Sequence, residues 1–183
     1  MRKESLRFAT NTSRNQRILD IGTGSGILIP SLARYGEVSA IDLEPIFLKK
    51  AKALAARYNL PADIQQADIL NLPFPDSTFD TITCISILEH VQDLDKAFAE
   101  TRRVMKPGAI LIVGVPIERF LVKSIFNLFG IKKEEDRGHC SHYTIIEKKL
   151  RKYFRLEHQK KIPSFLPDSL SLYKIYKCSK IES

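Results

Sequence analysis

The sequence predicts a single α/β domain, residues 1–183, built on a doubly wound, mostly parallel sheet of seven strands with an antiparallel hairpin at its C-terminal edge. Three observations support this prediction. Short apolar runs alternate with helical stretches between residues 18 and 115, which is typical of a parallel sheet with right-handed crossovers. Two further strand-like runs near the C-terminus have too short a connection for a parallel crossover. The length suits one domain with a sizeable core.

The first strand is expected at residues 18–21, a short apolar run that breaks into glycines at positions 22, 24 and 26. A run bounded in this way is typical of a buried parallel strand followed by a tight turn. Residues 27–35 predict a helix with Gly36 as its C-cap. Since proline fits only the first turn of a helix, Pro30 requires this helix to begin at Gly26 or later.

The strand and helix pattern then repeats along the chain. Residues 45–58 predict one helix and residues 93–105 another, with Asp93 as its N-cap and Pro107-Gly108 as its stop. A last helix is expected at 144–153. The remaining strands are expected at 38–42, 64–67, 79–85, 109–115, 154–159 and 170–178, of which the last two form the C-terminal hairpin. Residues 1–16 are expected to add only a short N-terminal extension.

The composition favours a cytoplasmic protein. The apolar and charged fractions, 44% and 27%, are those of a globular protein. Residues 1–17 lack the apolar core of a signal peptide, and the longest apolar run, 109–116, is too short to span a bilayer. Cys84, Cys140 and Cys178 are widely spaced, which fits a reducing compartment and predicts neither a disulfide framework nor a metal site.

The net charge of +8 is concentrated in the last third of the chain. Residues 1–115 carry 14 basic and 13 acidic side chains, whereas residues 116–183 carry 15 and 8. Two interpretations stay open. The excess could bind an anionic partner, such as a phosphorylated metabolite, a nucleic acid or an acidic membrane surface. It could instead be a solvated face that aids solubility, which is the interpretation we favour.

The glycine-rich turn predicts a ligand site, because glycines let the backbone approach a ligand and the next helix points free N–H groups at it. A dinucleotide-binding turn, G-x-G-x-x-G, would need glycine at position 27, which is Ile27. The match is instead to D-x-G-x-G-x-G. Asp20 would repel a pyrophosphate but attract an ammonium group. This disfavours a nicotinamide oxidoreductase and leaves a plain strand-to-helix connection as the alternative.

The same turn carries a family resemblance. The run Ile18-Leu19-Asp20-Ile21-Gly22-Thr23-Gly24-Ser25-Gly26 resembles motif I of class I S-adenosylmethionine-dependent methyltransferases. Later stretches are similar to the family's next strand ends and to the turn before its fifth strand: Ala40-Ile41-Asp42-Leu43, Ala67-Asp68-Ile69 with Leu72-Pro73-Phe74, Phe79-Asp80-Thr81-Ile82 with Leu88-Glu89-His90-Val91, and Arg103-Val104-Met105-Lys106-Pro107-Gly108-Ala109. The resemblance implies a Rossmann-like fold and a methyltransferase with S-adenosylmethionine as cofactor and S-adenosylhomocysteine as product.

The resemblance also implies which residues hold the adenosine end of the cofactor. Asp42 lies 20 residues after Gly22, at the end of the second strand, and would accept from the ribose hydroxyls. Leu43 would pack on one face of the adenine. Asp68 would accept from the adenine amino group, with Ile69 on the other face or donating its backbone N–H. The alternatives are a surface acid at Asp42 and a turn cap at Asp68.

The methionine end would lie over the first and fourth strands. Asp20 would hold the ammonium group, directly or through water. The backbone would provide the other contacts, at Gly22, Thr23, Gly24, Cys84 and Ile85. The Cys84 side chain is expected to be a small buried filler and not a nucleophile, since no cationic group stands near it in the sequence.

No spacing identifies a catalytic base. The candidates are His90, His142 and Tyr143, with Glu89 and His139 as further acceptor contacts. A base is needed only if the acceptor must lose a proton. The alternative, which we favour for each histidine, is a loop cap or a bond to a backbone carbonyl. No metal site is expected at His139, Cys140 and His142, because a second ligand pair is lacking.

Residues 117–131 combine a wide apolar face, rich in phenylalanine, with a narrow polar stripe. Such a face cannot lie open to water. We favour packing in the core or a substrate lid over residues 117–143, which would suit a lipophilic acceptor. A homodimer contact and a peripheral membrane contact are the alternatives.

The stretch after the fourth strand favours a small-molecule acceptor. Methyltransferases that act on nitrogens of nucleic acids and proteins often carry Asn/Asp-Pro-Pro-Tyr there, whereas this chain has Cys84-Ile85-Ser86-Ile87. No basic patch interleaved with aromatic residues indicates a nucleic-acid partner. The alternative from another functional class is an S-adenosylmethionine-binding partner or regulatory protein without catalysis.

Overall fold

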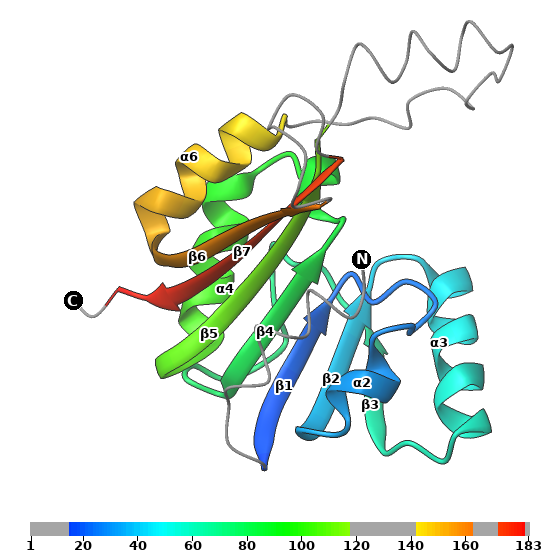
Figure 1. The fold of residues 1–183 in the computed structure, drawn as a ribbon. Coiled ribbons are helices and arrows are strands. Elements are labelled where there is room, and N and C mark those ends of the chain that lie inside the picture. Colours follow the sequence, from blue (N-terminus) through cyan, green and yellow to red (C-terminus); the bar gives the residue numbers. More distant parts are fainter. Residues whose placement is uncertain (1–14, 118–141, 163–171, 182–183) are drawn as a thin grey trace, which may run out of the picture.

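The fold is described by a computed structural model for residues 15–117, 142–162 and 172–181 (Figure 1). Its centre is a seven-stranded sheet with the strand order β3-β2-β1-β4-β5-β7-β6. The strands are β1 (Gln16–Ile21), β2 (Gly36–Asp42), β3 (Ala62–Gln66), β4 (Phe79–Ile85), β5 (Met105–Pro116), β6 (Phe154–Ile162) and β7 (Tyr173–Lys180). The first five strands pair in parallel, and β7 runs antiparallel to β5 and β6. This topology confirms the predicted α/β fold with an antiparallel C-terminal edge.

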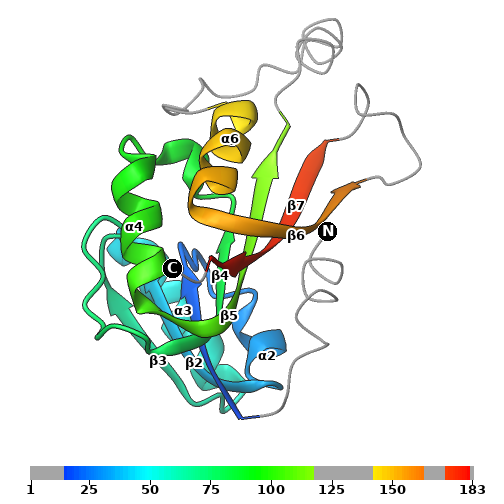
Figure 2. The same ribbon diagram turned by 90° about the vertical axis from the view of Figure 1, so that its left-hand side faces the viewer.

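Helices cover both faces of the sheet (Figure 2). On one face, α2 (Ile29–Leu32) and α3 (Pro45–Arg57) pack against β1, β2 and β3. On the other face, α4 (Leu94–Val104) and α6 (Tyr143–Tyr153) pack against β1, β4, β5 and β7. A short 3-10 helix, η1 (Leu88–His90), follows β4. Asp93 caps α4 as predicted, since its Oδ1 accepts from the Lys96 N–H at 3.0 Å.

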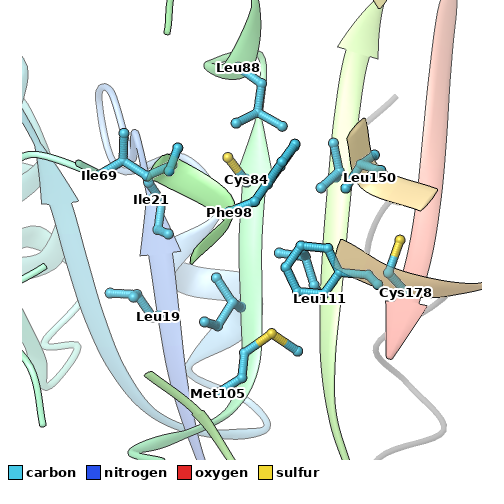
Figure 3. Close-up of a cluster of buried hydrophobic side chains, with 14 of the residues drawn as sticks. Leu19, Ile21, Ile69, Cys84, Leu88, Phe98, Met105, Leu111, Leu150 and Cys178 are labelled. Carbon is cyan, nitrogen blue, oxygen red and sulfur yellow. The ribbon is translucent and has the colours of Figure 1, made fainter. Parts of the chain in front are cut away.

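The larger part of the core lies between the sheet and the α4 and α6 helices (Figure 3). Leu19 and Ile21 of β1 point into it, whereas Ile18 points into the cluster under α2 and α3. Successive side chains of a strand alternate between faces, so β1 is buried on both sides. This is why Ile18, Leu19 and Ile21 are apolar on both faces of β1 instead of alternating with exposed polar residues, and why Asp20 between them is buried as well.

The first helix differs from the prediction. Only Ile29–Leu32 is helical, with Pro30 in the first turn as expected, and the C-cap is Ala33 instead of Gly36. Gly36 begins β2 and pairs with Gln16 of β1. A Cβ at Gly36 would lie 1.9 Å from the Gln16 carbonyl oxygen. Glycine is therefore required here by the close approach of two strands.

The turn before the fifth strand also differs. Pro107-Gly108 was expected to end the preceding helix, but α4 ends at Val104 and the dipeptide lies inside β5. The β4–β5 register shifts between Phe79 and Thr81, which pair with Met105 and Ile110. Such a bulge is the place in a strand that tolerates proline and a glycine with positive φ.

Some predictions concern residues outside the described ranges. These are most of the N-terminal extension 1–16 and the part of the candidate lid at 118–141, including His139 and Cys140. Within the described part of the chain, no helix is long and apolar enough to cross a membrane.

Candidate functional site

A pocket of about 120 Å³ opens at the carboxyl edge of the parallel strands. It is lined by the ends of β1 and β2, the loop after β3 and the turn after β4: Ile21, Gly22, Ile41, Asp42, Leu43, Ala67, Asp68, Ile69, Leu70, Ile87, His90 and Val91. The order of strands reverses at β1, whose neighbours are β2 and β4. Open α/β sheets bind ligands at such a switch point.

The structure brings five of the predicted cofactor residues together around this pocket, namely Gly22, Asp42, Leu43, Asp68 and Ile69. Among the candidate bases, His90 lines it too. The pocket lining does not include Asp20, Thr23, Gly24 or Cys84. Asp20 belongs to β1, and Thr23 and Gly24 belong to the loop that follows it.

The glycine-rich loop has the backbone conformation that only glycine adopts easily. Gly22 and Gly24 have φ angles of +69° and +54°. A Cβ at Gly22 would lie 2.9 Å from Ile87 Cβ, whereas a Cβ at Gly24 would meet no atom within 4 Å. Gly22 is thus packed against the turn after β4, and Gly24 borders open space.

Asp42 ties this loop to β2. Its Oδ2 accepts from the Gly24 N–H at 2.8 Å and its Oδ1 accepts from the Glu44 N–H at 3.0 Å. The side chain is 9% exposed, so the alternative of a surface acid is wrong. Each carboxylate oxygen has a second lone pair, so Asp42 retains the capacity to accept further hydrogen bonds from a ligand.

Asp68 has the turn-cap contact that was considered as its alternative role. Its Oδ1 accepts from the Leu70 N–H at 2.9 Å, and Asp68 forms an isolated bridge with Asn71. This contact fixes the side chain at the edge of the pocket. Two apolar side chains border the same pocket: Ile69 is buried, whereas Leu43 is 53% exposed. The pocket therefore combines a carboxylate with apolar surface.

Asp20 is a buried acid that lacks a full set of partners. It is 1% exposed, and its Oδ1 accepts from the Thr83 hydroxyl at 2.5 Å. Its Oδ2 and the Thr23 Oγ1 are buried without a hydrogen-bond partner among the described residues. Burial raises the pKa of Asp20 to about 6, although the hydroxyls of Thr83 and Thr23 act in the opposite direction. A buried acceptor without a donor costs free energy, which a cationic ligand with N–H donors would recover.

The other base candidates lie apart from the pocket lining. Nδ1 of His142 lies 3.1 Å from the Thr144 hydroxyl at the start of α6, and its ring centroid lies 4.6 Å from that of Tyr143, with the two planes tilted by 42°. Lys174 Nζ lies 5.0 Å from the centre of the Tyr143 ring. The contact of His142 is local, but it joins two side chains and is neither a helix cap nor a bond to a backbone carbonyl. Glu89 is buried in η1.

Cys84 is packed in the interior of β4 (Figure 3). Burial raises the pKa of its thiol well above the ordinary value, and the charges of Glu89 and Asp20 act in the same direction. A thiol in this environment is a filler and not a nucleophile. The contribution of its backbone to a cofactor site stays a prediction. In the described part of the chain, no group of three or more His, Cys, Asp or Glu side chains could hold a metal ion.

The sequence reasoning missed several lining residues, namely Ile87 and Val91 in the turn after β4, and Ala67 and Leu70 after β3. They belong to stretches where short turns interrupt the apolar periodicity. No local signal indicated them, because contacts such as that between Ile87 and Gly22 join residues far apart in the sequence.

Known proteins resemble this chain in sequence and in fold. Residues 19–113 match a family model described as a methyltransferase domain. The chain is 36% identical over 118 residues to norajmaline N-methyltransferase from Rauvolfia serpentina, covering 60% of this chain and 40% of that protein. It is 37% identical over 101 residues to demethylmenaquinone methyltransferase from Thermus thermophilus, covering 54% and 46%. Both matches span less than half of the relative's length.

A solved structure from Pyrococcus horikoshii OT3 has a TM-score of 0.78 with this chain at 23% sequence identity. The similarity covers 98% of this chain and 89% of that one. At this identity, the likeness is one of fold.

Proposed function

Because this chain belongs to the class I S-adenosylmethionine-dependent methyltransferase family, we propose that it transfers the methyl group of S-adenosylmethionine to a small-molecule acceptor. One observation carries the proposal: among the described residues, a buried carboxylate oxygen of Asp20 has no hydrogen-bond partner, and the residues directly after Asp20 line the pocket together with Asp42, Leu43 and Asp68. A ligand with an ammonium group at one end and an adenosine at the other has the complementary chemistry.

The pocket residues fit the adenosine end. Asp42 is fixed by two backbone N–H groups and accepts from the ribose hydroxyls with its remaining lone pairs. Leu43, which is exposed, and Ile69 provide the apolar surface that an adenine ring requires. Asp68 is held at the pocket edge by its contact with the Leu70 N–H and accepts from the adenine amino group.

The two buried acceptors fit the methionine end. An ammonium group has three N–H donors, and both the Asp20 Oδ2 and the Thr23 hydroxyl oxygen have lone pairs that can accept from it. The Gly24 N–H already donates to Asp42, and the open space in the direction of a Cβ at Gly24 leaves room for the ligand beside it. The pairing of the Asp20 carboxylate with the ammonium group of the ligand also explains why the chain tolerates an acid at a fully buried position of β1.

When bound, the cofactor supplies a methyl group that its sulfonium centre already activates. The chain's residues then bind the cofactor, orient the acceptor and keep water away from the reacting atoms. Ile87 and Val91 contribute apolar walls to the pocket, which exclude water. His90 lines the same pocket and is the candidate to accept a proton from an acceptor that must lose one.

The relatives and the sequence support a small organic molecule as the methyl acceptor. The names of the two relatives indicate norajmaline and demethylmenaquinone as their acceptors. We extend to this chain only what these share, which is a small organic molecule. The Phe-rich stretch at 117–131 supports a lipophilic acceptor.

Calorimetry followed by a transfer assay tests this function. The full chain should bind S-adenosylmethionine and S-adenosylhomocysteine but not NAD, and should transfer a radiolabelled methyl group to at least one member of a panel of phenols, quinols and amines. Binding of NAD but not of S-adenosylmethionine would contradict the proposal that the pocket binds S-adenosylmethionine. Cofactor binding without transfer to any panel member would favour a non-catalytic binding protein.

A further inference from the structure

The residue that follows β4 has an unusual backbone conformation. Ser86 has a φ of +56°, in the left-handed region where the Cβ of a non-glycine residue crowds the following carbonyl. Its N–H donates to the Gly114 carbonyl at 2.8 Å. The side chain of Ser86 is exposed, so burial of that side chain does not compensate for the strain. A side-chain contact can offset this strain.

Tyr173 provides this contact. It is the first residue of β7, and because β7 runs antiparallel to β5, Tyr173 lies at the carboxyl edge of the parallel strands. Its phenol oxygen lies 2.7 Å from Ser86 Oγ. The ring is buried, and a Cβ at Gly114 would come within 2.7 Å of the phenol oxygen. The absence of a side chain at Gly114 therefore lets Tyr173 reach across β5 to Ser86.

The hydrogen bond between Tyr173 and Ser86 does not titrate near neutral pH. Burial raises the pKa of the Tyr173 hydroxyl well above its ordinary value, although the contact with Ser86 acts in the opposite direction. The phenol thus keeps its proton in all conditions where the protein would be assayed. A change of pH is therefore no substitute for mutation in testing this contact.

The turn that begins at Ser86 forms one wall of the pocket. Ile87 is the next residue. Its side chain packs so closely on Gly22 that a Cβ at Gly22 would lie only 2.9 Å from the Ile87 Cβ. Ile87 and His90 both line the pocket, and the His90 N–H donates to the Ile87 carbonyl at 2.9 Å. The backbone conformation at Ser86 consequently sets the position of this wall relative to the glycine-rich loop.

We propose that Tyr173 is a positioning residue for the cofactor pocket: its hydrogen bond to Ser86 stabilises the left-handed turn after β4 and thereby holds Ile87 against Gly22. This inference rests on the proposed function, since it takes the ligand of the pocket to be S-adenosylmethionine. It assigns a role in cofactor binding to β7, which lies outside the residues that match the family model.

The test compares the affinity for S-adenosylmethionine, measured by calorimetry, between the wild-type chain and three single variants. Tyr173→Phe and Ser86→Ala each remove the hydrogen bond and should weaken binding about two- to tenfold, the range of one neutral hydrogen bond. The double variant Y173F/S86A should bind no more weakly than either single variant, because both remove the same bond.

Replacement of Ser86 by glycine should restore the affinity for S-adenosylmethionine that loss of the hydrogen bond lowers. Glycine adopts a positive φ without the penalty of a Cβ, so Ser86→Gly should bind within about twofold of wild type. The double variant Y173F/S86G should also return to within about twofold of wild type. If Tyr173 served only to fill the core, a substitution at an exposed residue would not restore the affinity that Y173F loses.

Ser77 offers a matched control. It is exposed, has a φ of +51° and precedes β4 at the opposite edge of the sheet, where its N–H donates to the Arg103 carbonyl. Ser77→Ala and Ser77→Gly should change the thermal unfolding temperature as Ser86→Ala and Ser86→Gly do. They should leave the affinity for S-adenosylmethionine unchanged.

The outcomes separate the inference from the proposed function. If the wild-type chain does not bind S-adenosylmethionine, the proposed function fails and the inference fails with it. If the wild-type chain binds and the Y173F and S86A variants bind equally tightly, only the inference is overturned. It is also overturned if S86G binds as weakly as S86A, since the backbone conformation would then not be the quantity that Tyr173 controls.

Discussion

Asp42 illustrates how one side chain connects the glycine-rich loop with the pocket. It accepts from the N–H groups of Gly24 and Glu44 and also lines the pocket wall. Its removal would release the loop and delete the proposed ribose acceptor in one step. Loss of function at this position therefore has a structural and a ligand-binding component, which a conservative variant separates.

Asp42→Ala should abolish binding of S-adenosylmethionine, a loss of at least about 100-fold, because it removes a charged acceptor and leaves two N–H groups without their partner. Asp42→Asn keeps one carbonyl acceptor and should lose less. Calorimetry measures both, and Asp63→Ala on the exposed side of β3 is the control. Near-normal affinity of the Asp42→Ala variant would contradict the assignment of Asp42 as the acceptor for the ribose hydroxyls.

Asp20 creates a conflict between stability and binding. Its pKa is raised to about 6 from an ordinary value of 3.8, so the folded chain holds this proton up to a higher pH than the unfolded chain does. The stability that this group contributes is complete below pH 3.8 and is lost as the pH rises through about 6. The proposed ammonium ligand requires the opposite form, which is the carboxylate.

Asp20→Asn should therefore stabilise the ligand-free chain at pH 7 by at most about 3 kcal/mol, the free energy of a shift of roughly two pKa units. The gain should vanish at pH 4, which urea unfolding at the two pH values will show. In wild type, affinity for S-adenosylmethionine should fall as the pH drops below about 6. The variant should bind more weakly and without this pH dependence; a variant that binds as tightly as wild type would exclude Asp20 as the ammonium partner.

Among the elements, α4 does more than cover the sheet, because Arg103 near its C-terminal end holds the loop that leads into β4. The Arg103 guanidinium donates to the carbonyls of Leu72 and Phe74 at 2.9 and 2.7 Å. It also pairs with the carboxylates of Glu100 and Asp76, which raise the pKa of Arg103. A planar group with five donors fits this set of acceptors.

Arg103→Lys should destabilise the chain by about 1–3 kcal/mol, because a lysine ammonium cannot reach two carbonyls and two carboxylates together. The neighbouring Arg102→Lys is the control. Arg102 donates to the Ile181 carbonyl at an exposed position, and its replacement should cost less than about 0.5 kcal/mol. Urea unfolding at neutral pH measures both, and equal costs would refute the special role of Arg103.

At the scale of the whole molecule, one core cluster joins elements from both ends of the described chain. Phe98 of α4 is fully buried and contacts the rings of Tyr153 and Phe154, with centroid distances of 5.9 and 5.8 Å. These two residues mark the junction of α6 and β6. The C-terminal hairpin and the parallel part of the sheet therefore share a single core and should unfold together.

Phe98→Ala should cost about 3–5 kcal/mol, a large share of the stability of a domain of this size. Phe47→Ala provides the contrast, since Phe47 on α3 is 40% exposed and its removal should cost less than about 1 kcal/mol. Thermal unfolding followed by circular dichroism checks both. A two-step transition in the wild-type chain would contradict the single core.

Much of this molecule follows from its amino-acid order alone, because apolar periodicity and the positions of glycine and proline are local signals. They specified all seven strands, although the observed strand boundaries differ by up to four residues, as at Met105. They also placed Asp42 and Asp68 at ends of neighbouring strands, and parallel strands have their carboxyl ends at one edge. The predicted family and fold therefore agree with the observed topology.

Other features required the folded chain, because they depend on contacts between residues far apart in sequence. No local pattern indicates that β7 lies between β5 and β6, or that Gly36 serves a close strand approach and not a helix end. The contact between Ser86 and Tyr173 joins residues 87 positions apart. Local propensity acts over a few residues, whereas packing selects partners by shape and distance, and so the pocket wall after β4 emerged only from the three-dimensional arrangement.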